Sequence, residues 1–223
     1  MRETPFIKIC GVKTPEMALA AAEAGATHVG LVFFPPSPRA LDVPAAQRIA
    51  SALAGGAAVV ALLVDSDDAA IEAVAAAVAP DYLQLHGQET PARAREVRRQ
   101  AATPIIKAVG VATPADVAAA QAAFADVDLL LFDAKPPPGS SRPGGHGAPF
   151  DWSALAGAAA APPWALSGGL TPETVADAAA RAARIPGFRG VDVSSGVEAA
   201  RGEKDAGRVR AFVEAAQSAM QGV

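Results

Sequence analysis

The single cysteine of this chain, Cys10, ends a short apolar run and is followed at once by a glycine. A second apolar run, 127–133, ends in the same way on a carboxyl group, Asp133, and continues into a segment rich in glycine and proline. If both runs are strands of one parallel barrel, their carboxyl ends lie at the same mouth, where a thiol and a carboxyl group could face one substrate. Taken alone, a single cysteine more often packs as a small hydrophobic residue.

Two other apolar runs end on hydroxyl and glycine residues, Ser167-Gly168-Gly169 and Ser194-Ser195-Gly196. Counted along the chain, these runs are the seventh and eighth expected strands. Barrels commonly bind a phosphate at these two strand ends, against backbone N–H groups that glycine leaves accessible. Glycines also serve tight turns between strand and helix. The occurrence of two such ends on these two strands favours the phosphate site.

Three polar side chains are further candidates for contacts with a ligand. Arg39 lies in a loop stiffened by prolines, where its guanidinium could form a bidentate pair with a ligand carboxylate. Gln84 and His86 alternate onto one face of the fourth expected strand, so both could point into the barrel mouth. Loop arginines are often merely solvated, and a lone histidine is more often structural than catalytic.

Lys8 shares one strand face with Cys10, and Asp192 shares one with Ser194 on the eighth strand. The first and eighth strands are neighbours when a barrel closes. A buried Lys8 needs an anionic partner, and Asp192 is the nearest candidate. We expect a cation beneath Cys10 to lower the pKa of the thiol and favour the thiolate.

Eight apolar runs, each followed by a helical pattern, predict the elements that position these residues. Their near-continuous hydrophobicity is typical of parallel strands buried on both faces. The chain has no G-x-G-x-x-G after its first strand, so an open dinucleotide-binding sheet is the weaker alternative to a single-domain (β/α)8 TIM barrel over residues 1–223. The expected strands cover 6–11, 28–33, 58–64, 82–86, 105–109, 127–133, 164–167 and 190–194. The expected helices begin near Thr14, Pro44, Asp65, Thr90, Thr113, Asp151, Thr171 and Asp205.

Composition narrows the class of function. With 223 residues, 51% of them hydrophobic, the chain can bury one large core. Its net charge of −4 provides no basic surface for nucleic acid or anionic lipid, so a small-molecule ligand is expected. A single cysteine excludes an internal disulfide and a cysteine-based zinc site, and no apolar run is long enough to span a membrane. We expect a cytoplasmic protein.

The segment from Lys135 to Pro149 is the one long irregular stretch, rich in proline and glycine. Compact domains seldom contain such a loop without a functional reason, which predicts an active-site loop. Its composition also suits a disordered surface insertion.

Together, these motifs closely resemble those of phosphoribosylanthranilate isomerases over essentially the whole chain. The motifs are Ile7-Lys8-Ile9-Cys10-Gly11, Gly30-Leu31-Val32-Phe33 with Ser37-Pro38-Arg39, Leu83-Gln84-Leu85-His86-Gly87, Leu130-Leu131-Phe132-Asp133, Pro143-Gly144-Gly145 with Phe150-Asp151-Trp152, Leu166-Ser167-Gly168-Gly169-Leu170 and Val191-Asp192-Val193-Ser194-Ser195-Gly196-Val197-Glu198.

The resemblance implies a barrel of the ribulose-phosphate-binding type that rearranges N-(5-phosphoribosyl)anthranilate in tryptophan biosynthesis. It implies that Cys10 is the general base, Asp133 the general acid and Arg39 the contact for the anthranilate carboxylate, with phosphate at the two glycine-bearing ends. It implies no metal and no cofactor, in a monomer or homodimer. One departure is His146, which stands where the family usually has serine or threonine.

Two alternatives remain at this point. The first is another sugar-phosphate isomerase or epimerase, such as an aminoimidazole-carboxamide ribotide isomerase. The related barrels with that chemistry use a pair of aspartates, so Cys10 argues against this alternative. The second is a non-catalytic phosphate-binding scaffold, which would keep the glycines but would need neither Cys10 nor Asp133.

Overall fold

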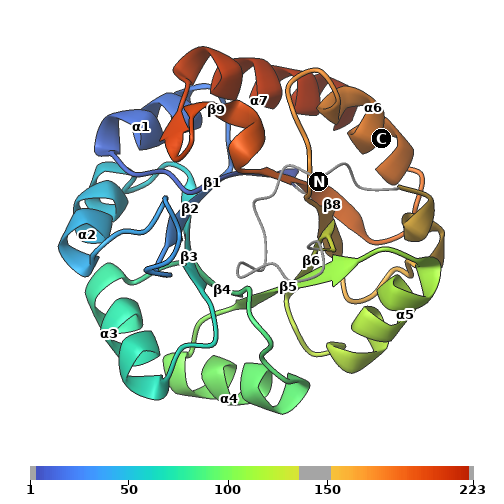
Figure 1. Cartoon of the computed structure of the whole chain (residues 1–223), viewed down its shortest axis with the longest axis horizontal. Coiled ribbons are helices and arrows are strands. Elements are labelled where there is room, and N and C mark those ends of the chain that lie inside the picture. The colour runs from blue at the N-terminus through green and yellow to red at the C-terminus, as the bar shows by residue number, and fades with distance from the viewer. Residues whose placement is uncertain (1–3, 136–151, 221–223) are drawn as a thin grey trace.

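The computed structural model of the chain describes residues 4–135 and 152–220. Eight parallel strands pair in chain order, and β8 pairs with β1, so the sheet closes into a barrel. Figure 1 looks down this barrel, with the strands as the inner ring and the helices outside them. The predicted (β/α)8 architecture is confirmed, and the open sheet is excluded. The strands are β1 (Phe6–Cys10), β2 (His28–Val32), β3 (Ala58–Leu63), β4 (Tyr82–Leu85), β5 (Ile105–Val111), β6 (Leu129–Ala134), β7 (Trp164–Leu166) and β8 (Phe188–Val193).

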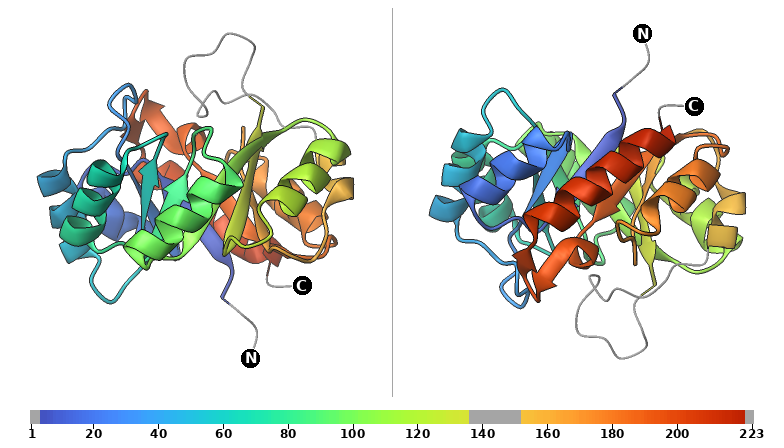
Figure 2. Two further views of the ribbon diagram at one scale, coloured as in Figure 1. Left: turned by 90° about the horizontal axis from the view of Figure 1, so that it is seen from below. Right: turned by 90° about the horizontal axis from the view of Figure 1, so that it is seen from above.

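Helices flank the barrel along its length in both side views (Figure 2). Five of them begin where the side chain of a threonine or aspartate accepts a hydrogen bond from a backbone N–H of the first turn, which satisfies a donor that would otherwise have no partner. The helical elements are α1 (Pro15–Glu23), α2 (Val43–Ala52), α3 (Asp68–Val78), α4 (Pro91–Ala101), α5 (Pro114–Ala123), the 3-10 helix η1 (Trp152–Gly157), α6 (Val175–Ala182), the 3-10 helix η2 (Ser195–Val197) and α7 (Ala206–Met220).

One local expectation needs correction. The seventh helix does not begin at Thr171, because the amide of Thr171 donates to Oγ1 of Thr174 at 3.0 Å and residues 172–174 form a turn before α6. The short helix expected near Trp152 is present, as a 3-10 helix. The structure also contains an antiparallel hairpin that the sequence did not predict, formed by β9 (Glu198–Ala200) and β10 (Glu203–Lys204).

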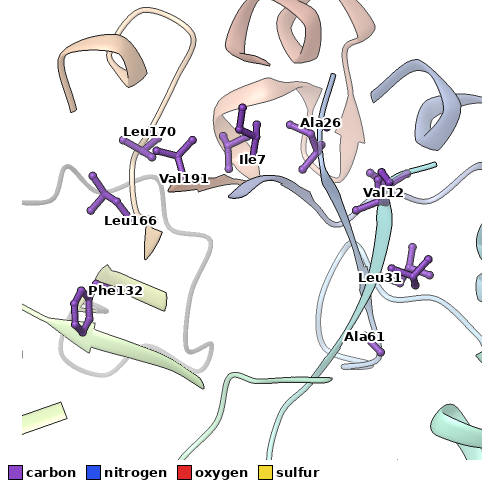
Figure 3. Close-up of a cluster of buried hydrophobic side chains, with 14 of the residues drawn as sticks. Ile7, Val12, Ala26, Leu31, Ala61, Phe132, Leu166, Leu170 and Val191 are labelled. Atoms are coloured by element: carbon purple, nitrogen blue, oxygen red, sulfur yellow. The ribbon is translucent and has the colours of Figure 1, made fainter. Parts of the chain in front are cut away.

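Side chains alternate between the two faces of each strand. The outer ones, among them Ile7, Leu31, Phe132 and Val191, pack around the outside of the strand ring against the helices (Figure 3). The inner ones form a separate apolar cluster, consisting of Phe6, Val60, Ile106, Ala108, Leu129, Leu131 and Ala165. Further along the same inner faces, toward the carboxyl ends of the strands, polar side chains such as Lys8, Gln84 and Asp133 lie beside a second, smaller apolar cluster of Cys10, Val32 and Leu62. The alternation therefore directs the predicted chemistry to one mouth of the barrel.

The expected active-site loop lies outside the described residues apart from Lys135. No helix within the described ranges is long and apolar enough to cross a lipid bilayer.

Candidate active site

The first strand brings Lys8 and Cys10 to the inside of the barrel. Both lie on the same strand face as Phe6, and Lys8 is completely buried. Nζ of Lys8 donates to Oδ1 of Asp192 at 2.8 Å, and the two residues are register partners across the pairing of β1 with β8. The predicted ion pair is thus confirmed. Asp192 and Cys10 attract the ammonium more strongly than burial disfavours it, so the pKa of Lys8 is raised.

The state of the thiol differs from the expectation. Burial raises the pKa of Cys10 above its ordinary value, and the positive charges of Lys8 and Lys204 only partly offset this effect. The negative charge of Asp192 acts in the same direction as burial. The sequence argument correctly placed a cation next to the thiol. It was wrong about the net shift, because it could not weigh desolvation and the second charge of the ion pair.

The sixth strand presents Asp133 on the same inner face as Leu131. Oδ1 of Asp133 accepts from the amide of Ala134 at 2.7 Å, and Oδ2 lies 3.6 Å from Nε2 of His86. Nδ1 of His86 lies 2.9 Å from Nε2 of Gln84, which can only donate. The Nε2 side of the His86 ring therefore faces Asp133. Oε1 of Gln84 is buried and has no hydrogen-bond partner among the described residues.

The seventh and eighth strands connect the thiol side of the mouth to the carboxyl side. Oγ of Ser167 donates to Oδ2 of Asp192 at 3.1 Å, so both carboxylate oxygens of Asp192 are engaged. The amide of Ser167 donates to the carbonyl of Phe132, the residue before Asp133. These contacts run from β1 through β8 and β7 to β6. They fix the relative position of the two strand ends that carry Cys10 and Asp133.

The two glycine-bearing ends lie together, as predicted. A side chain at Gly196 would collide with the carbonyl of Leu170, immediately after Gly169. A side chain at Gly168 would lie 2.8 Å from Oδ1 of Asp133. The amides of Gly168 and Gly169 donate no hydrogen bond to any other described residue. This arrangement leaves backbone donors beside the expected acid, where an anion can bind.

The comparisons with known proteins agree with this geometry. Residues 7–215 match a family model described as N-(5'phosphoribosyl)anthranilate (PRA) isomerase. The chain belongs to this isomerase family. A relative from Nitrobacter hamburgensis, N-(5'-phosphoribosyl)anthranilate isomerase, is 50% identical over 96% of this chain and 93% of its own length.

Two solved isomerase structures have the same fold. The phosphoribosyl anthranilate isomerase from Thermotoga maritima is 34% identical and superposes with a TM-score of 0.82, over 96% of this chain and all of the other. A second structure, in complex with reduced 1-(o-carboxyphenylamino)-1-deoxyribulose 5-phosphate, is 33% identical with a TM-score of 0.78 and the same coverage.

Within this isomerase fold, Arg39 is not a free loop arginine. It is buried, and its Nε and Nη2 donate to the two carboxylate oxygens of Glu198 at 2.6 and 3.0 Å. Lys204 also donates to Glu198, at 2.8 Å, and to the backbone carbonyl of Ser194 at 3.0 Å. Sequence reasoning missed Glu198 and Lys204 as members of the site. Glu198 stands within one of the quoted motifs, but only the folded hairpin shows which cations it contacts.

Proposed function

We propose that this chain converts N-(5'-phosphoribosyl)anthranilate to 1-(2-carboxyphenylamino)-1-deoxyribulose 5-phosphate, an Amadori rearrangement in tryptophan biosynthesis. Membership of the isomerase family supports this proposal. The observation that carries it is the placement of Cys10 and Asp133 on inward faces at one mouth, joined by the contacts of Asp192 and Ser167. The expected cytoplasmic location stays a prediction.

In the first step, Asp133 acts as the general acid. Its carboxyl proton moves to the ring oxygen of the ribose, the bond between that oxygen and C1 breaks, and the nitrogen lone pair forms an iminium with C1. Asp133 is left as a carboxylate. Nε2 of His86 lies 3.6 Å from Oδ2, and in this proposal it carries a proton, so the imidazole stabilises the new negative charge as the contact shortens.

In the second step, Cys10 acts as the general base. Its thiolate removes the proton from C2 of the open sugar, and the electron pair of the C–H bond forms a double bond between C1 and C2 while the nitrogen recovers its lone pair. The resulting enolamine then takes a proton at C1 and loses one from its hydroxyl, which gives the ketose. Substrate and product are isomers, so no electrons enter or leave the site.

The remaining predicted residues bind and orient the substrate in this proposal. Arg39 receives the anthranilate carboxylate. The phosphate lies against the backbone of Ser167-Gly168-Gly169 and Ser194-Ser195-Gly196. Gln84 fixes the tautomer of His86, and Asp192 holds Lys8 beneath the thiol.

Replacing each catalytic residue by alanine tests the proposal. Loss of a general acid or base should lower kcat by about 100-fold or more, with a much smaller effect on KM. Asp128→Asn is a matched control, because Asp128 directly precedes the other end of β6 and pairs with Arg98. It should affect stability but not kcat.

The same measurements separate the alternatives. A purified chain that binds the reduced product analogue but does not turn over the substrate would indicate a phosphate-binding scaffold. Cys10→Ala with kcat near that of the wild type would contradict the base assignment. The same result for Asp133→Ala would contradict the acid assignment.

A further inference from the structure

One buried carboxylate, Glu198, holds two cations at once. Its Oε1 accepts from Nε of Arg39 and from Nζ of Lys204, at 2.6 and 2.8 Å. Its Oε2 accepts from Nη2 of Arg39 and from the amide of Gly202, both at 3.0 Å. The side chains of all three charged residues are at most 8% exposed. The three charges sum to one net positive charge at the barrel mouth.

The pair with Glu198 decides which edge of Arg39 remains for a ligand. A guanidinium has five N–H donors in a rigid planar fork. Glu198 engages the edge formed by Nε and Nη2. The edge that remains is formed by Nη1 and the second N–H of Nη2. The side chain also lies directly over Gly11, where a Cβ atom would collide with Cδ of Arg39. Two independent contacts therefore hold the fork in one orientation.

The other partner of Glu198 leads to the thiol. Nζ of Lys204 also donates to the backbone carbonyl of Ser194. Oγ of Ser194 in turn donates to the carbonyl of Cys10 at 3.1 Å. The hairpin that carries Glu198 and Lys204 packs on the loop of Arg39. At Gly202 the two segments are so close that an added Cβ atom would lie 2.7 Å from the carbonyl oxygen of Pro38. Glu198 thus stands between the loop after β2 and the end of β8.

We propose that Glu198 is a positioning residue that fixes Arg39 so that the edge formed by Nη1 and Nη2 receives the substrate carboxylate. This inference rests on the proposed function, in which Arg39 binds that carboxylate. Glu198 itself does not touch the substrate. With Glu198 in place, the carboxylate approaches a fork whose orientation is already set, so little conformational entropy is lost on binding.

Two stable ligands test this role without turnover. One is reduced 1-(o-carboxyphenylamino)-1-deoxyribulose 5-phosphate, and the other is its phenylamino counterpart without the carboxylate. Isothermal titration calorimetry gives the ratio of their Kd values, which measures the preference for the carboxylate. In Glu198→Gln the neutral amide cannot accept both donors of the fork, so the preference should fall about tenfold, the scale of one charge-assisted hydrogen bond. Binding of the counterpart should be nearly unchanged.

Glu89→Gln is the matched control. Glu89 is also buried, and it accepts from Nζ of Lys107 at 2.9 Å and from the amide of Gly87 at 2.9 Å. Both glutamine variants should lose stability, but Glu89→Gln should keep the carboxylate preference. If Glu198→Gln fails to fold by circular dichroism, Glu198→Asp replaces it, because aspartate keeps the charge and withdraws it from Arg39 by one methylene group.

Arg39→Ala separates two kinds of failure. If this variant keeps the carboxylate preference, Arg39 does not bind the carboxylate and that part of the proposed function is wrong. If Arg39→Ala abolishes the preference while the glutamate variant keeps it, Arg39 reads the carboxylate without help and the positioning role of Glu198 is wrong. Equal loss of preference in Glu198→Gln and Glu89→Gln would also overturn the role, because it would reflect general destabilisation.

Discussion

Removing either partner of the Lys8–Asp192 ion pair should move the pKa of Cys10, in opposite directions. Lys8 attracts the thiolate, and Asp192 repels it. In Lys8→Met the thiolate loses its cation and keeps the repulsion, so the pKa of Cys10 should rise further. In Asp192→Asn the repulsion disappears. Lys8 also loses its main partner, so the thiolate of Cys10 becomes the anion with which Lys8 can pair. The pKa of Cys10 should then fall.

The burial of this pair sets the magnitudes. Opposite charges within about 4–6 Å shift a pKa by about one to three units, and both Lys8 and Cys10 are inside the barrel. We expect a larger shift for Lys8→Met than for Asp192→Asn, because Lys8 affects the pKa of the thiol more strongly than Asp192 does. Lys8→Met should also lower the free energy of unfolding by about 3–5 kcal/mol, because it leaves a buried carboxylate whose remaining side-chain donor among the described residues is Ser167.

The chain allows a direct measurement, because Cys10 is its only cysteine. The rate of alkylation by iodoacetamide, followed by mass spectrometry across pH, reports thiolate formation at this one residue. The double variant Lys8→Met with Asp192→Asn removes both charges, so its midpoint should lie between those of the single variants and its stability should exceed that of Lys8→Met. If both single variants move the midpoint in the same direction, the charges of Lys8 and Asp192 do not control the pKa of Cys10 as argued, and the reasoning is refuted.

Two further predictions concern stability and the acid. His28 lies between the rings of Phe6 and Tyr82. Burial there lowers the pKa of its imidazole to about 4, and the charge of Lys8 adds a smaller effect in the same direction. The unfolded chain therefore protonates His28 more readily than the folded chain does. The free energy of unfolding should therefore rise by up to about 3 kcal/mol between about pH 4 and 6.5, and urea titrations of His28→Gln should show a flatter dependence. Gly168→Ala should lower kcat at least about tenfold, because its methyl group would displace the carboxyl of Asp133. Gly55→Ala is the control, since the φ of Gly55, +81°, is nearly that of Gly168, +82°, but the space around Gly55 is open. This variant should lose stability and keep its kcat.

The sequence predicted the barrel and its polar mouth because both follow from local patterns. Continuous apolar runs specify strands buried on two faces, and the alternation within each run specifies which side chains share an inner face. Barrel closure then makes β1 and β8 neighbours, which is enough to pair Lys8 with Asp192. The start of α6 was less predictable, since Thr171 and Thr174 are both plausible first residues. Their hydrogen bond to each other decides the boundary.

The contacts of Arg39 could not be predicted in the same way. Its partner, Glu198, lies 159 positions further along the chain, in a hairpin that has no strong pattern of its own. Glu198 also looks like an ordinary solvated residue, because nothing local shows that two cations approach it. Here those cations outweigh the cost of burying the carboxylate and lower the pKa of Glu198 to about 2. The sequence shows which charged residues are present, but not which of them pair with one another in the folded chain.

Burial raises the pKa of Cys10, and the neighbouring charge of Lys8 opposes this effect. Each unit by which burial raises the pKa lowers the thiolate fraction at neutral pH about tenfold, but it also makes the thiolate a stronger base toward a carbon acid. In the proposed mechanism, a fully buried thiol without a neighbouring cation would supply less of the thiolate that removes the proton from C2. Lys8 supplies the cation, and Asp192, together with the thiolate itself, offsets the burial that disfavours the ammonium. The ion pair thus keeps part of the basicity that burial provides while limiting the loss of thiolate.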